Sequence, residues 1–196
     1  MNSLMTNENV KVFWHDKVLR YTVLRLIPKD IHPNHLTVLR VILTPFVLYY
    51  LWLEKWEVCV PLFLFAALTD LLDGSLARTR KLITMWGTVA DPIADKMLIG
   101  SVVILFVAKE VNVYFAAVIV LVELAIAITA VVRRLRHQPF ISANWYGKIK
   151  MLLQVIGVTT LLVARWSGVD MMVPFSIGTL SIAIVFALMS LYTYGL

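Results

Sequence analysis

The sequence has little cysteine and little charge. Cys59 is the single cysteine among 196 residues, so the chain can form neither an internal disulfide nor a cysteine-based metal cluster. Charged residues make up 15% of the chain and hydrophobic residues 60%, whereas soluble domains have about 25% and roughly 45–50%. Together with a mean hydropathy of +0.83, this composition argues strongly against a soluble single domain.

No secretion signal is expected from the first residues either. Residues 1–10 are polar and contain no apolar core followed by a small-residue cleavage site, so no signal peptide is predicted. The formal net charge is +6, from 18 Lys and Arg against 12 Asp and Glu. Since the basic residues flank apolar segments, we expect a membrane setting and no nucleic-acid partner.

Residues 10–27 predict an amphipathic helix. Apolar residues such as Phe13, Leu19 and Leu24 recur at helical spacing, opposite a face that carries Lys17 and Arg20. This segment is too charged to span a bilayer, and two interpretations are open: it lies on an anionic membrane surface, or it packs on another part of the protein. The breaker-rich residues 28–34 end it. We therefore expect a juxtamembrane segment at 1–34 and a membrane domain at 35–196.

Six apolar runs follow, each close to the roughly 20 residues that a membrane-spanning helix needs. They cover residues 36–53, 58–77, 87–108, 113–132, 146–164 and 171–192. These runs predict an all-α integral membrane protein with six transmembrane helices.

The basic residues predict the orientation of these helices. If the N-terminus is cytoplasmic, 15 of the 18 Lys and Arg fall on the cytoplasmic side, and only Lys55, Lys109 and Arg165 fall on the other. This asymmetry follows the positive-inside rule and predicts that both termini lie in the cytoplasm. Asp73 precedes Lys81 by eight residues, about 12 Å of helix, so we expect the site described next toward the cytoplasmic face of the cytoplasmic membrane.

Four carboxylates lie where charge is costly. Asp70 and Asp73 end the second run and share one helix face, and Asp91 and Asp95 share a face of the third run. Carboxylates inside a spanning segment indicate a functional site. Four that converge would repel one another without a cation, and oxygen ligands favour Mg²⁺, Mn²⁺ or Ca²⁺ over Zn²⁺.

Small and basic residues accompany these carboxylates. Gly74 and Ala77 leave room for close approach, Arg78 carries a forked donor for phosphate oxygens, and Gly87 opens the third run with free N–H groups. The set predicts a site for a pyrophosphate or a migrating phosphoryl group. Two alternatives stay open: a cation or proton relay of a transporter, with ordinary small-residue helix packing, or a non-catalytic scaffold.

The spacing of these residues is similar to a known signature. The pattern Asp70-x2-Asp73-Gly74-x2-Ala77-Arg78-x8-Gly87-x3-Asp91-x3-Asp95 resembles that of the CDP-alcohol phosphotransferase family at all eight specified positions. A second stretch, Pro33-Asn34-His35-Leu36-Thr37-x2-Arg40, is also similar to one common in these enzymes.

The resemblance implies an enzyme that transfers a substituted phosphate from a CDP-linked donor, here CDP-diacylglycerol, to an alcohol and releases CMP. It implies Mg²⁺ or Mn²⁺ as cofactor, Asp70, Asp73, Asp91 and Asp95 as metal ligands, and Asp95 as general base. It also implies a homodimer. The residues that it assigns to the CDP-lipid are Pro33, Asn34, His35, Leu36, Gly74, Ala77, Arg78, Thr84 and Gly87.

Basic residues between the fourth and fifth runs are candidates for binding the acceptor. Two interpretations are open for Arg133, Arg134, Lys148 and Lys150. They bind the phosphate of a phosphorylated alcohol, or they are only the positive charges that flank membrane spans on the cytoplasmic side. The segment 147–150 (GKIK) resembles bacterial phosphatidylglycerophosphate synthases, which implies glycerol 3-phosphate as acceptor.

The fourth run departs from that pattern. Those synthases commonly have Arg-Glu early in this span and another Arg two turns later, whereas here Val122 precedes Glu123 and Ala130 stands at the later position. Inositol phosphate and phosphatidylglycerol stay open as acceptors. Glu123 either partners the nearby basic groups or is only a hydrogen-bonded interior residue.

Overall fold

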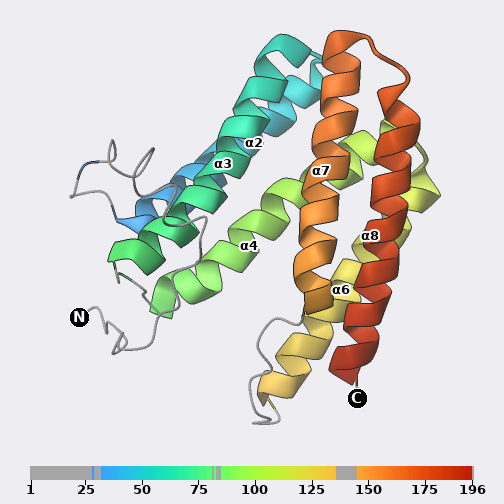
Figure 1. The fold of residues 1–196 in the computed structure, drawn as a ribbon. Helices are drawn as coiled ribbons and strands as arrows, with labels where there is room; N and C mark the ends of the chain where they lie inside the picture. The colour runs from blue at the N-terminus through green and yellow to red at the C-terminus, as the bar shows by residue number, and fades with distance from the viewer. Residues whose placement is uncertain (1–27, 29–31, 81, 83–84, 136–144, 196) are drawn as a thin grey trace. The chain divides into compact units, whose positions relative to one another are not determined.

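The structure is a computed structural model that describes residues 28, 32–80, 82, 85–135 and 145–195. In this part of the chain every regular element is a helix (Figure 1). The elements are α2 (Pro33–Trp52), α3 (Trp56–Arg80), α4 (Met85–Val102), the π-helix η1 (Val103–Val107), α5 (Ala108–Glu110), α6 (Val113–Leu135), α7 (Trp145–Ser167) and α8 (Met172–Gly195). The all-α prediction is confirmed, and all six apolar runs are helical.

Four of the described helices are long and apolar enough to cross a membrane, namely α2, α3, α7 and residues Met172–Thr193 of α8. In α6 the apolar stretch is shorter, Val113–Thr129, and the third predicted run is divided among α4, η1 and α5. The chain is therefore an integral membrane protein, while the number of six spans stays a prediction. The amphipathic helix predicted at 10–27 lies outside the described residues.

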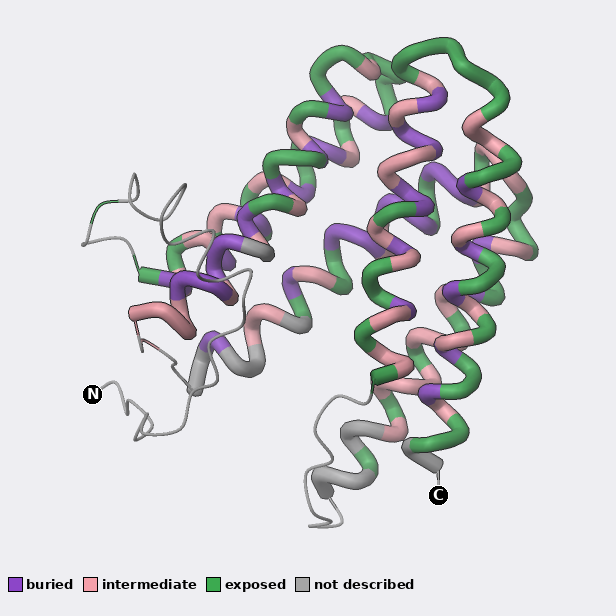
Figure 2. The backbone as a smooth tube through the Cα atoms, in the orientation of Figure 1, coloured by how far each residue is buried: buried purple, intermediate pink, exposed green. Residues whose placement is uncertain are grey.

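The chain forms two compact units, Met1–Leu98 and Ile99–Leu196. In the first, α2 and α3 pack together as a hairpin, and buried residues recur along both helices (Figure 2). Val47 of α2 and Phe63 of α3 are both 0% exposed. The turn between them places Glu54 at φ 55°, and the Lys55 N–H donates to the Tyr50 carbonyl oxygen at 3.1 Å. This hairpin and α4 supply the predicted carboxylates.

In the second unit, α7 packs along α8, and α6 packs on α8 and η1. The backbones of α7 and α8 approach closely at Gly157, whose carbonyl oxygen accepts a hydrogen bond from Ser176 Oγ at 2.7 Å. A Cβ at Gly157 would lie only 2.7 Å from Leu180 Cγ. Glycine is therefore required at position 157 by the contact between the two helices.

The helix ends in the second unit are capped by their own sequence. Asn112 Oδ1 accepts the Tyr114 N–H at 2.7 Å, which caps the N-terminus of α6. Gly168, at φ +70°, ends α7, and the Val169 N–H donates back to the Ala164 carbonyl oxygen at 3.2 Å.

Arg165 connects these two turns. Its Nε lies 2.7 Å from Glu110 Oε2, so the α5–α6 turn and the α7–α8 turn are at the same end of this unit. The charge pattern of the sequence assigns Lys109 and Arg165 to one side of the membrane, and the ion pair agrees with that assignment.

Candidate active site

The site is built around the first half of α2. Thr37 and Arg40 are three residues apart and so share one face of the helix, together with Thr44. Arg40 is 0% exposed and Thr37 1% exposed. Burying a guanidinium in an apolar helix is unfavourable unless acidic groups compensate it.

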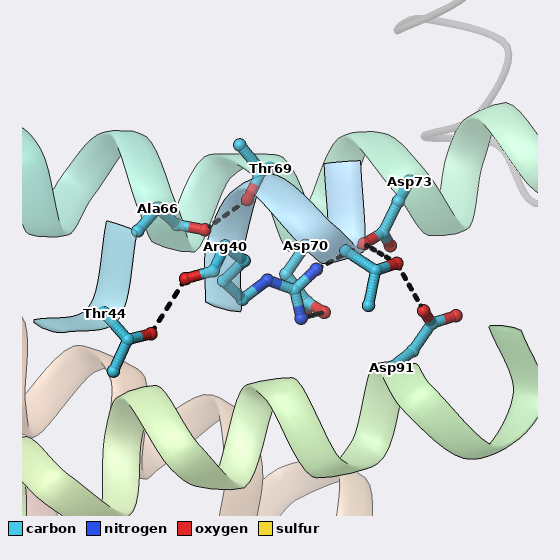
Figure 3. Close-up of polar contacts among 8 residues, drawn as sticks. Arg40, Thr44, Ala66, Thr69, Asp70, Asp73 and Asp91 are labelled. Carbon is cyan, nitrogen blue, oxygen red and sulfur yellow. Dashed lines mark hydrogen bonds and ion pairs between the residues drawn. The ribbon is translucent and has the colours of Figure 1, made fainter. Parts of the chain in front are cut away.

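Two carboxylates of α3 compensate Arg40. Its Nη1 lies 2.7 Å from Asp70 Oδ1, and its Nη2 donates a hydrogen bond to Asp73 Oδ2 (Figure 3). Asp73 is 3% exposed and Asp70 is 31% exposed. The guanidinium fork therefore spans the two aspartates that the i, i+3 spacing places on one face of α3.

A third carboxylate comes from α4. Thr37 Oγ1 donates a hydrogen bond to Asp91 Oδ1 at 2.6 Å and lies 3.4 Å from Asp73 Oδ2. In Figure 3 Asp91 points from α4 toward α2 and α3. Asp70, Asp73 and Asp91 therefore meet around two side chains of α2.

The chemistry of this donor set fits a hard divalent cation. In the part of the chain that the structure describes, no group of three or more His, Cys, Asp or Glu side chains is close enough to hold a metal ion. In this structure the carboxylates contact Thr37 and Arg40. The available donors are nevertheless all carboxylate oxygens, which Mg²⁺ and Mn²⁺ prefer over the nitrogen and sulfur ligands typical of zinc.

The fourth carboxylate and Arg78 lie on the same two helices. Asp95 is half-buried on α4, one turn after Asp91. Arg78 is half-buried near the end of α3, and its guanidinium folds back so that a Cβ at Gly74 would lie 3.2 Å from Nη1. Gly74 therefore leaves space for the Arg78 side chain, a use for that glycine that the sequence did not indicate.

The remaining residues assigned to the CDP-lipid are spread over three helices. Pro33 is buried at the first position of α2, and His35 is exposed, with its Nδ1 accepting the His32 N–H at 3.4 Å. Asn34, Leu36 and Ala77 are half-buried, and Gly87 is buried in the first turn of α4. Thr84 lies outside the described residues.

The acceptor candidates belong to the second unit. Lys150 is buried on α7, and its Nζ lies 2.5 Å from Glu123 Oε1 of α6, which also accepts from Gln154 Nε2 at 3.0 Å. Lys148 is exposed. Arg133 and Arg134 fall in the last turn of α6, and their side chains are outside the described part. Of the two interpretations of Glu123, a partner for the basic groups is the one that the structure supports.

Thr37 and Arg40 are the site residues that sequence reasoning missed. Both lie within the second family-like stretch, and the charge pattern treats Arg40 only as an orientation signal. The available clue was that Arg40 lies four residues inside a predicted span, where an isolated positive charge is unfavourable. Its acidic partners are 30 and 33 residues away in sequence and become neighbours only when α2 packs on α3.

The fold and this site define a helical integral membrane protein with a buried cluster of carboxylates. The sequence profile of the CDP-alcohol phosphatidyltransferase family matches residues 30–192, and the chain belongs to this family. It is a CDP-diacylglycerol-dependent phosphatidyltransferase, of a family that is generally dependent on divalent metals.

Curated relatives are similar over most of the chain. A CDP-diacylglycerol–glycerol-3-phosphate 3-phosphatidyltransferase of Sodalis glossinidius is 31% identical, covering 83% of this chain and 91% of its own. An enzyme of the same name from Pectobacterium atrosepticum is 31% identical, and the match covers 83% of this chain and 91% of that enzyme. Another from Haemophilus influenzae is 32% identical, and the match covers 83% of this chain and 90% of that enzyme.

Proposed function

We propose that this protein transfers the phosphatidyl group of CDP-diacylglycerol to glycerol 3-phosphate, forming phosphatidylglycerophosphate and CMP in phospholipid synthesis. The observation that carries the proposal is the meeting of Asp70, Asp73 and Asp91 around Arg40 and Thr37. The names of the similar curated proteins support glycerol 3-phosphate as the acceptor.

The cofactor in this proposal is Mg²⁺ or Mn²⁺. Asp70, Asp73, Asp91 and Asp95 would hold it, and when bound it would neutralise the negative charge of the pyrophosphate and of the departing CMP. Arg78 would donate to phosphate oxygens. The rest of the CDP-lipid would contact Pro33 to Leu36, Gly74, Ala77, Thr84 and Gly87.

In the reaction, Asp95 accepts the proton from the attacking hydroxyl of glycerol 3-phosphate. The hydroxyl oxygen forms a bond to the phosphorus that carries diacylglycerol, and the bond from that phosphorus to the oxygen bridging to CMP breaks. CMP leaves with the electron pair. A carboxylate is a weak base toward an alcohol, so proton transfer becomes important late, as positive charge develops on the attacking oxygen.

Lys150 would bind the phosphate of the acceptor, together with Lys148, Arg133 and Arg134. Lys150 is favoured because Glu123 and Gln154 hold its neighbourhood in a fixed geometry. A preorganised cation binds a phosphate with a smaller entropic cost than a freely rotating one.

In the same proposal the membrane domain comprises residues 35–196 with six spans, and residues 1–34 form a juxtamembrane segment. Both termini lie in the cytoplasm, the site opens toward the cytoplasmic face of the cytoplasmic membrane, and the enzyme is a homodimer. The 15 basic residues on one side support this orientation.

The proposal is tested by CMP release from CDP-diacylglycerol by the purified protein in detergent. We expect release that requires Mg²⁺ or Mn²⁺ and depends on glycerol 3-phosphate, with little from inositol phosphate, serine or phosphatidylglycerol. A different productive acceptor would overturn the assigned substrate. Cation flux in liposomes without any CMP release would indicate a transporter instead.

Substitutions of single aspartates test which residue is the base and which residues hold the metal. Asp95→Asn should lower kcat by about 100-fold or more, since it removes the base, and should leave Mn²⁺ binding partly intact, since three aspartates remain to hold the ion. Asp73→Asn should lose both activity and Mn²⁺ affinity. The matched control is Glu57→Gln, which neutralises an exposed carboxylate at the start of the same helix, α3. Full activity of Asp95→Asn would show that another group is the base.

A further inference from the structure

Arg40 and Thr37 of α2 each contact the aspartates through single carboxylate oxygens. Arg40 contacts Oδ1 of Asp70 and Oδ2 of Asp73, and Thr37 donates to Oδ1 of Asp91. The side-chain contacts of Arg40 and Thr37 thus use one oxygen of each carboxylate. A carboxylate held by one oxygen cannot rotate freely, and its second oxygen keeps a fixed direction.

The charges in this group also favour a divalent cation. Asp70, Asp73 and Asp91 carry three negative charges and Arg40 one positive charge, which leaves a net charge of −2. Asp95, the fourth proposed ligand, adds a further negative charge. Without Arg40, three carboxylates from two helices would repel one another at short range in a poorly solvated environment.

We propose that Arg40 and Thr37 are positioning residues of the metal site: each holds the aspartates by one oxygen and so presents the other oxygen to the divalent cation. This inference rests on the metal site assigned under the proposed function. Neither residue binds the metal. Groups that orient metal ligands in this way typically change metal affinity by about 10- to 100-fold when they are lost.

The two residues act differently. Thr37 is neutral and links Asp91 of α4 to Asp73 of α3, so it sets the spacing between the helices that carry the ligands. Arg40 supplies charge as well as geometry, and only a planar fork reaches Asp70 and Asp73 together. Lysine at position 40 would keep the charge but contact one carboxylate at a time.

The test measures Mn²⁺ affinity of the purified protein by the electron paramagnetic resonance signal of the unbound ion, with no substrate present. Thr37→Val keeps the shape of the side chain and removes the hydroxyl, and we expect about tenfold weaker binding or more. Thr37→Ser restores the hydroxyl and should bind as the wild type does. Thr44→Val is the matched control, because Thr44 is buried on the same face of α2 and donates only to the Arg40 carbonyl oxygen at 2.8 Å.

Arg40→Lys should also weaken Mn²⁺ binding by tenfold or more, while thermal unfolding without metal changes less than for Arg40→Gln. Wild-type Mn²⁺ affinity in both Thr37→Val and Arg40→Lys would overturn this inference and leave the proposed metal site standing. Tighter binding by Arg40→Lys would overturn it too, since Arg40 would then compete with the cation. If the wild-type protein binds no Mn²⁺, the proposed metal site and this inference fail together.

Discussion

Glu123 and Lys150 lie 27 residues apart and form an ion pair across α6 and α7, with Oε1 and Nζ 2.5 Å apart. Their side chains are 20% and 11% exposed, so the pair is largely shielded from solvent. Gln154 donates to the same carboxylate oxygen at 3.0 Å. The interaction places one charged and one polar residue of α7 against a single acidic residue of α6.

Removing one member of this pair should destabilise the protein. Glu123→Leu leaves Lys150 without its partner, and we expect unfolding in detergent to be easier by about 3 kcal/mol. The double variant Glu123→Leu with Lys150→Met should regain much of that loss, because no unpaired charge remains. Thermal unfolding of the two variants checks this. Equal or greater instability of the double variant would contradict it.

The contact of α7 with α8 should not tolerate a methyl group at position 157. A Cβ there would lie 2.8 Å from Leu180 Cδ2 and 2.9 Å from Thr179 Oγ1. Gly157→Ala should therefore lower stability by about 2 kcal/mol through overpacking. Gly178→Ala on α8 is the control, because nothing lies within 4 Å of its added Cβ. The prediction is wrong if the two variants unfold at the same temperature.

The two ion pairs of Arg165 should differ in strength. Glu110 lies 2.7 Å from its Nε and is 15% exposed, whereas Asp170 lies 3.5 Å from Nη1 and is 87% exposed. We expect Glu110→Gln to cost about 1 kcal/mol and Asp170→Asn to have no measurable effect, since exposed pairs are screened by salt. Unfolding at low and high ionic strength measures both. A salt-dependent loss in Asp170→Asn would contradict the assignment.

The orientation can be tested with single cysteines in a Cys59→Ala background. Glu54 and Val169 are exposed in the α2–α3 and α7–α8 turns, which the charge pattern assigns to the non-cytoplasmic side. Glu54→Cys and Val169→Cys should react with a membrane-impermeant maleimide in intact cells. Lys148→Cys should react only after permeabilisation. Labelling of position 148 in intact cells would reverse the proposed topology.

The sequence predicted the helices well because apolar runs depend on local composition. α3 begins at Trp56 rather than at residue 58 and continues to Arg80, so Arg78 is part of the helix and not of the following link. The sequence predicts the third run as one regular helix, whereas in the structure the π-helix η1 interrupts it. A short π-helical turn inside an α-helix keeps the apolar composition of the run, so hydrophobic periodicity does not reveal it.

The carboxylates were predictable and their partners were not. Asp70, Asp73 and Asp91 stand out because charge in an apolar run is rare. The contacts of Thr37 with Asp91 and of Lys150 with Glu123 join residues 54 and 27 positions apart. Such contacts depend on how helices rotate against one another, which the periodicity of a single segment does not determine.

The position of Arg40 has a consequence for biogenesis. When α2 leaves the ribosome, Arg40 is an isolated charge in the first half of an apolar segment, where its insertion is unfavourable, by up to about 2.5–3.5 kcal/mol, the cost of a positive charge at a helix centre. Asp70 and Asp73 follow only after the three-residue turn and most of α3 have been synthesised. The α2–α3 hairpin is thus the smallest part of the chain that can enter the bilayer without an uncompensated guanidinium, and the two helices are expected to insert together.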